Sequence, residues 1–133
     1  MKNVMIAAIF ALFAFTLLDN AEAIHNGWFA PDEVVGQKNP FLSDKGALAE
    51  GKKVYKKNCM KCHGPSGKGD GASAGSLQIE LPDFSDKGIT MEETDGAWFW
   101  KVRVGQFEMP PFQLALKDDQ IWKAIIYVRS LAK

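Results

Sequence analysis

Cys59-Met60-Lys61-Cys62-His63, near the middle of this 133-residue chain, contains the only two cysteines of the sequence. A histidine directly follows the second cysteine. In the C-x-x-C-H pattern of c-type haem attachment, each thiol adds to a vinyl group of haem and the imidazole binds the iron. The pattern predicts one covalently attached haem c, held by Cys59 and Cys62, with His63 as an axial iron ligand.

Three other uses of a cysteine pair fit this sequence less well. A thioredoxin-like redox pair lies beside a β-α-β pattern, which is not visible around Cys59 and Cys62. A structural zinc site needs four Cys or His ligands, and after residue 23 the chain offers only these two cysteines, His25 and His63. A disulfide closing so short a loop removes little entropy from the unfolded chain and so stabilises the fold little.

Residues 1–23 have the composition of a secretory signal peptide. Lys2 precedes an apolar run from Val4 to Leu18, and Ala21-Glu22-Ala23 is a small-x-small cleavage site. The alternative is a retained anchor helix, but the run is shorter than the ~20 residues that span a bilayer. We therefore expect cleavage after about Ala23, no stable membrane anchor, and a periplasmic protein whose thiols meet haem outside the reducing cytoplasm.

The charge balance gives no sign of a nucleic-acid partner. The whole chain has 16 basic and 16 acidic residues; removal of Lys2, Asp19 and Glu22 with residues 1–23 leaves 16 − 1 = 15 basic and 16 − 2 = 14 acidic residues. A net charge near zero lacks the basic patch that binds phosphates. The remaining 110 residues suffice for one small domain, to whose core a covalent haem would contribute.

Hydrophobic periodicity predicts an all-α fold. Helical spacing of apolar residues is found in 45–58, 96–104 and 118–132. Five glycines exclude a regular element from most of 64–82. Residues 24–44 are irregular and form an N-terminal extension that Trp28 and Phe29 pin to the domain at 45–133.

Several short motifs in a fixed order resemble those of a small monohaem class I cytochrome c, from about Ala47 to Leu131. They are Ala49-Glu50-Gly51-Lys52-Lys53-Val54-Tyr55, Cys62-His63-Gly64-Pro65-Ser66-Gly67-Lys68-Gly69-Asp70-Gly71, Pro82-Asp83-Phe84-Ser85-Asp86, Thr94-Asp95-Gly96, Met109-Pro110-Pro111-Phe112 and the segment 124–131. The resemblance implies three to five helices around one haem. It also implies that the N- and C-terminal helices cross, where Gly51 and Tyr55 meet Tyr127.

Met109 is the best candidate for the second axial ligand. It lies 109 − 63 = 46 residues after His63, and Pro110-Pro111 stiffens the loop that must present its sulfur. It also matches the methionine-proline signature of the resembled family. Met91, in an acidic stretch, and His25 are the alternatives.

Other residues have weaker predicted roles around the haem. The second ring nitrogen of His63 is expected to donate to a carbonyl, although Ala72 stands where relatives often have a proline. Trp98 and Trp100 either line the haem or bond a propionate, or they are plain core residues. Phe112 and Leu131 are expected to pack on the ring.

Five lysines crowd the helix that enters the haem motif: Lys52, Lys53, Lys56, Lys57 and Lys61. Their spacing places them largely on one solvent face. This cluster is either a docking patch for an acidic redox partner or a solubilising helix face.

The sequence thus favours an electron carrier that is not itself an enzyme. His63 and Met109 ligation fills both axial positions of the iron, as outer-sphere electron transfer requires. One alternative is a haem subunit of a larger redox enzyme complex, with 24–40 as a docking arm. Another is an open-site haem protein that binds a gas.

Overall fold

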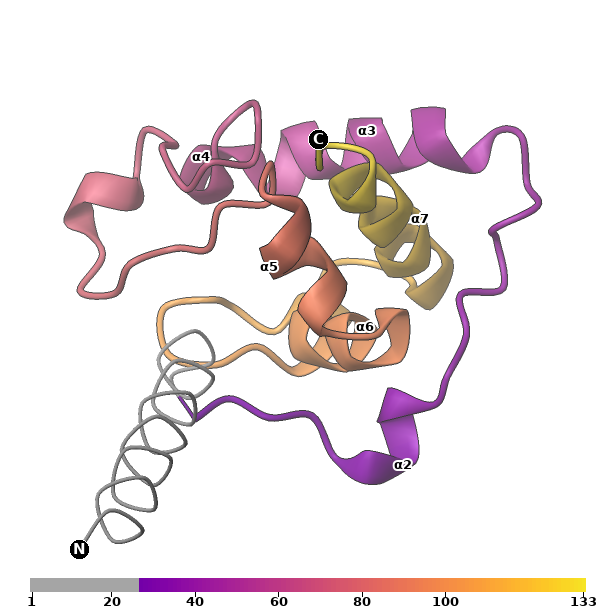
Figure 1. The fold of residues 1–133 in the computed structure, drawn as a ribbon. Helices are drawn as coiled ribbons and strands as arrows, with labels where there is room; N and C mark the ends of the chain where they lie inside the picture. Colours follow the sequence, from indigo (N-terminus) through magenta and orange to yellow (C-terminus); the bar gives the residue numbers. More distant parts are fainter. Residues whose placement is uncertain (1–26) are drawn as a thin grey trace, which may run out of the picture.

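The structure, a computed structural model, describes residues 27–133, and helices supply its regular elements (Figure 1). The elements are α2 (Asp32–Val35), α3 (Ala47–Asn58), α4 (Met60–His63), α5 (Lys87–Glu92), α6 (Asp95–Val104) and α7 (Asp118–Arg129), with 3-10 turns at Ala74–Ser76 and Phe112–Leu114. Within 27–133 there is no strand, only an isolated bridge between Gln106 and Met109. The predicted all-α class is confirmed. The predicted signal peptide and His25 lie outside the described residues.

The crossing of α3 and α7 forms one half of the core (Figure 1). On α3, Ala47, Gly51 and Tyr55 are buried and lie four residues apart, on one face of the helix. The rings of Tyr55 and Tyr127 meet at 5.2 Å between centroids, as the resemblance implied. The three atoms nearest to a Cβ at Gly51 belong to the backbone of Lys123 and Ala124, and the Cβ would overlap the Lys123 carbonyl. Gly51 therefore lies at the crossing, against the turn of α7 that precedes Tyr127. Only glycine lets the two helices approach this closely.

Helix α6 packs on α7 and completes the core. The hydroxyl of Thr94 accepts a hydrogen bond from the Ala97 N–H, 3.2 Å away, which caps the first turn of α6. The rings of Phe99 and Trp122 stack at 4.1 Å between centroids with an interplanar angle of 4°. Trp122 belongs to a buried cluster with Ile121 and Ile125. The second predicted helix is therefore present, and its inner face holds one wall of the site described below.

The short helices depend on local contacts rather than on periodicity. Helix α5 starts where the Asp86 carboxylate accepts a hydrogen bond from Gly88 N–H at 2.7 Å.

The last long helix, α7, ends at Arg129, three residues before the predicted end. Beyond it, the Lys133 N–H bonds the Ser85 carbonyl at 3.2 Å. In the described part of the chain, no helix has the length and apolar character needed to cross a membrane.

Candidate haem site

A cavity of about 320 Å³ brings the predicted haem residues together. Cys59, Cys62, His63 and Met109 all lie in its wall. Most of the rest of the wall is apolar, with contributions from the 77–84 segment, α6, the loop after α6 and α7. An apolar cavity with a few converging polar groups is the usual form of a cofactor site. Two thiols and an imidazole are the groups that attach c-type haem, and a thioether is the usual second axial ligand in cytochromes c.

The backbone of α4 is held by the loop that follows it. The last carbonyls of a helix have no partner within the helix. Three N–H groups of the loop supply these partners: Ser73 bonds Lys61 O at 2.9 Å, Gly71 bonds Cys62 O at 3.0 Å, and Gly69 bonds His63 O at 2.9 Å. The glycine-rich loop predicted after the motif therefore folds back on the motif itself and fixes its backbone.

His63 is positioned for metal binding by burial and by a ring contact. Its imidazole stacks on Phe84, with 4.9 Å between centroids and 25° between planes. Burial lowers the pKa of His63 to about 4, so the ring is neutral at neutral pH, and neutral imidazole is the metal-binding form.

The second-nitrogen contact expected for His63 is not found among residues 27–133. Nδ1 is buried and has no hydrogen-bond partner there, neither a carbonyl near Ala72 nor another group. Buried ring nitrogens nearly always have a partner.

Both cysteines are free thiols in the structure. Burial, helped by the nearby Cys62, raises the pKa of the Cys59 thiol to about 12. Cys59 is therefore protonated at neutral pH.

Within 27–133 no group of three or more His, Cys, Asp and Glu side chains is arranged to hold a metal ion.

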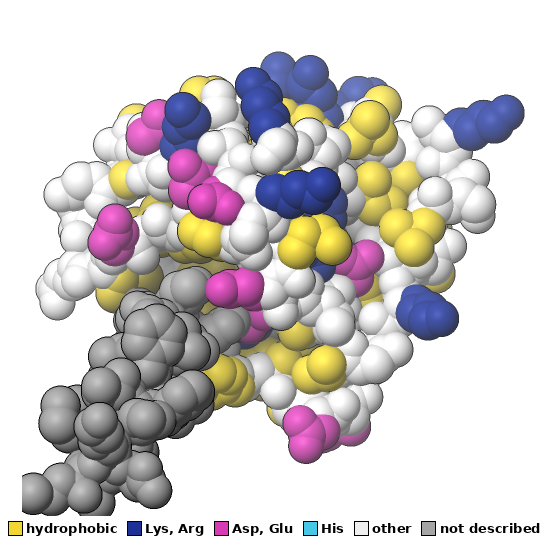
Figure 2. Space-filling model, viewed as in Figure 1, with side chains coloured by type: hydrophobic (Ala, Val, Ile, Leu, Met, Phe, Trp, Pro, Cys, Tyr) yellow, Lys and Arg dark blue, Asp and Glu magenta, His cyan; other side chains and the backbone are white. Residues whose placement is uncertain are grey.

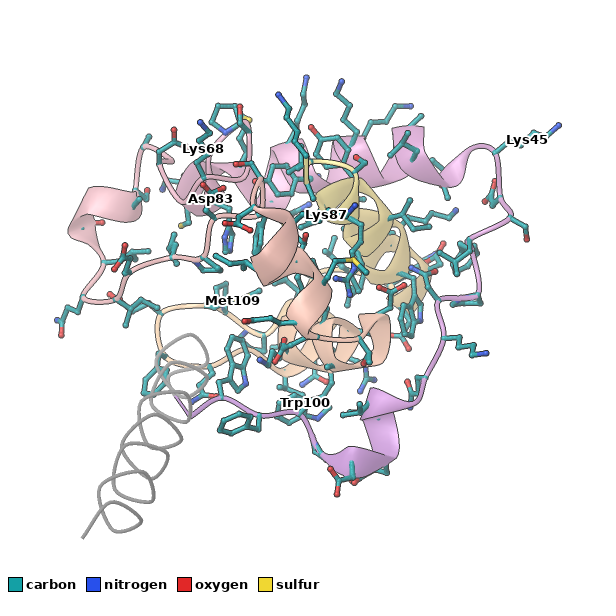
Figure 3. All side chains as sticks on the ribbon, in the orientation of Figure 1. Lys45, Lys68, Asp83, Lys87, Trp100 and Met109 are labelled. Atoms are coloured by element: carbon teal, nitrogen blue, oxygen red, sulfur yellow. The ribbon has the colours of Figure 1, made fainter. Side chains whose placement is uncertain are left out.

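Met109 is presented to the cavity by a closed turn on the loop after α6 (Figure 3). Gln106 and Met109 exchange two backbone hydrogen bonds, of 3.1 and 3.0 Å. Phe107 inside the turn has a φ of 53°, which costs a non-glycine residue free energy. At Gly105, with a φ of 65°, a Cβ would lie 2.6 Å from the Met109 carbonyl oxygen. The turn therefore depends on glycine at 105.

The alternative ligand Met91 is placed elsewhere. It lies on α5, is 67% exposed and is not part of the cavity wall. Met60, inside the motif, packs on the cluster of Tyr55 and Tyr127. Among the described methionines, Met109 is the one in the cavity wall.

The remaining predicted haem contacts divide into two groups. Trp98 and Phe112 line the cavity, whereas Trp100 and Leu131 do not. Leu131 instead packs on the Tyr55 cluster.

Several apolar residues of the wall were not predicted as haem contacts, among them Leu77, Ile79 and Leu81. They alternate with Gln78 and Glu80, which are exposed. This alternation of exposed and half-buried residues was a partial signal, because alternate residues of an extended segment face the same side, although Glu80 also borders the cavity. Trp28, in the predicted extension, also lines the cavity.

The five clustered lysines lie on α3 and α4, and all are exposed. Figure 2 shows basic side chains gathered over α3, at the top of that view, and acidic ones over the centre and left. Lys61 also belongs to the cavity wall, so the cluster reaches the edge of the site.

Comparisons with known proteins show which family the chain resembles. In solved structures, the chain is similar to one described as a Kuenenia stuttgartiensis reducing HAO-like protein complex, at 31% sequence identity and a TM-score of 0.61. The similarity covers 74% of this chain and 49% of the other, so this chain spans about half the length of that one. No curated protein matches the chain. The family model described as cytochrome c oxidase, cbb3-type, subunit III matches residues 46–128, more than half of the sequence. The chain therefore belongs to this family of c-type cytochromes and is a haem electron-transfer protein.

Proposed function

We propose that the protein carries one haem c, attached through Cys59 and Cys62, with His63 and Met109 as its axial ligands, and that it passes single electrons between redox proteins. The observation that carries this proposal is the convergence of these four side chains, from α3–α4 and the distant 105–117 loop, on one cavity. His63 and Met109 are 46 positions apart in the sequence, yet both line this cavity.

Each residue has a defined task in this proposal. The two thiols form the covalent tether by adding S–H across the vinyl groups, so neither an oxidant nor a reductant is consumed. Bound haem supplies an iron that gains or loses one electron. The thioether of Met109 favours ferrous iron and so raises the potential. The apolar wall excludes water, and the two filled axial positions argue against a gas-binding role.

We also propose that residues 1–23 are an export signal and that the mature protein works in the periplasm. Support comes from the apolar run and from the small residues at Ala21 and Ala23. N-terminal sequencing of the protein from a periplasmic extract tests this. A mature chain beginning near Ile24 supports export, and an intact Met1 contradicts it.

A second candidate is a fixed subunit of a larger redox complex. It is favoured by the family description, an oxidase subunit, and by the similar structure, which comes from a protein complex. Gel filtration of gently solubilised native membranes and of periplasm separates the two cases. A haem protein eluting at its own mass supports a free shuttle; co-elution with other redox proteins through several columns supports a subunit.

Haem attachment is the first test of the proposal. In the alkaline pyridine spectrum we expect one haem c per chain, retained after acid–acetone extraction. Cys59→Ala or Cys62→Ala should each leave a single thioether bond, which shifts that spectrum, and the double variant should lose its haem. Because a small domain depends on its cofactor for core, the haem-free chain should also lose most of its helical circular dichroism. Native helicity without haem contradicts this expectation.

A further inference from the structure

The N-terminal segment 27–44 precedes the family region but is fastened to it. Asn39 is 4% exposed, and its side-chain amide donates to the Trp122 carbonyl at 2.8 Å. The Thr94 hydroxyl donates to the Val35 carbonyl at 2.6 Å. At Gly96 of α6, a Cβ would overlap the Val34 carbonyl. The segment therefore packs on the domain at several points.

Its contribution is Trp28, which lines the cavity. The indole Nε1 is buried and has no hydrogen-bond partner among residues 27–133. Indole N–H is a donor only, and a buried donor without an acceptor costs free energy. Trp98 also lines the cavity, but its indole nitrogen is not among the buried unpartnered atoms. Trp28 therefore needs an acceptor from outside the described chain.

A positive charge lies beside Trp28. The Lys101 Nζ is 5.4 Å from the centroid of the Trp28 ring and forms an ion pair with Glu93. The Lys101 side chain is only 11% exposed and lies in the cavity wall. Nζ lies over the ring face, so an acceptor of the indole N–H would lie near this positive charge. A carboxylate suits such a place, since hydrogen bonds to a charged acceptor are the stronger kind.

Haem carries two carboxylates of its own, the propionates. We propose that the Trp28 indole N–H donates a hydrogen bond to one haem propionate, with Lys101 as the neighbouring positive charge. This inference rests on the proposed haem attachment, and it makes segment 27–44 part of the haem site. Trp28 is thus a positioning residue that tunes the iron through the propionate.

The contact is tested first in the unmodified holoprotein. In the ferrous protein, the Trp28 indole proton should show nuclear Overhauser contacts to the methylene protons of one propionate. Trp28→Phe identifies the signal by its disappearance. Two results overturn the assignment: contacts from this proton to Glu92 or Glu93 alone, or no contact to any acceptor side chain or propionate. Both are read in the parent protein, so they hold even if the variant does not fold.

The reduction potential supplies the second readout. The donated hydrogen bond offsets part of the propionate charge, so its loss lets that charge favour ferric iron more strongly. Trp28→Phe should therefore lower the potential while haem content and the axial-ligand spectrum stay unchanged. Trp100→Phe, the same change outside the cavity wall, should leave the potential unchanged.

The two proposals fail in different ways. A pyridine spectrum without covalent haem rejects the haem proposal itself. Normal haem attachment, with equal potentials in Trp28→Phe, Trp100→Phe and the parent, rejects only the role of Trp28.

Discussion

Met109 and Met91 have the same thioether side chain, yet only Met109 faces the cavity. The difference comes from the backbone around them. Met109 ends a closed turn that Gly105 and Phe107 make sharp by adopting positive φ, whereas Met91 lies on an outer face of α5. Backbone strain held by surrounding contacts is common where a side chain must be presented to a ligand.

Met109→Ala tests this assignment. We expect loss of the weak sulfur-to-iron charge-transfer band of the ferric protein, a reduction potential lower by on the order of 0.1 V, and new binding of carbon monoxide to the ferrous form. Spectroelectrochemical titration and a carbon monoxide difference spectrum measure these changes. Met91→Ala is the matched control and should behave as the parent does. A parent-like spectrum for Met109→Ala would remove Met109 from the iron.

At the scale of elements, the contact between α3 and α7 depends on Gly51. Alanine there gains about 1 kcal/mol of helix propensity over glycine. Its Cβ, however, would overlap the backbone carbonyl of Lys123, which has no flexible end that could move aside. Overpacking costs roughly 1–3 kcal/mol, and displacing backbone lies toward the upper end of that range. The steric cost should therefore exceed the propensity gain.

Gly51→Ala should lower the melting temperature of the holoprotein by about 5 °C or more. Thermal unfolding followed by circular dichroism measures this. Gly75→Ala is the control, because nothing lies within 4 Å of a Cβ at that position and its φ is not positive. If both variants melt like the parent, the two helices do not need their close approach at Gly51.

The long helices were predictable and the short ones were not. Helices α3, α6 and α7 have 10 to 12 residues, enough for an apolar face to recur in the sequence. Helices α2 and α4 have four residues each, so they show no period, and tertiary contacts stabilise them. Trp28 was not predicted as a cavity residue for a related reason. The segment that contains it packs on the domain through contacts between residues far apart in the sequence, such as Asn39 with Trp122, which are 83 residues apart.

At the scale of the whole molecule, charge is distributed unevenly although it sums to zero. Figure 2 shows the basic side chains over α3, and Lys61 extends this face to the cavity wall. A positive face beside the redox site raises the encounter rate with negative partners, and salt screens this effect.

Reversing Lys53, Lys56 and Lys57 to Glu should slow oxidation of the ferrous protein by hexacyanoferrate(III) about tenfold or more at low ionic strength. The rates should converge with the parent near 1 M salt, where the Debye length is about 3 Å. Stopped-flow absorption measures both. Lys38, Lys45 and Lys133 changed to Glu give the same net charge at other exposed positions. Equal slowing in both variants would mean that net charge, not the α3 face, controls the encounter.

The bonds from the 69–73 loop to the carbonyls of Lys61, Cys62 and His63 have a consequence for the timing of maturation. Once they form, both thiols are held in a cavity wall with a fixed backbone beneath them. The proposed haem attachment needs both thiols within reach of the vinyl groups. Attachment as proposed above would therefore be easiest while this loop is still open. A change that closes this loop before haem arrives should lower the share of chains that carry haem.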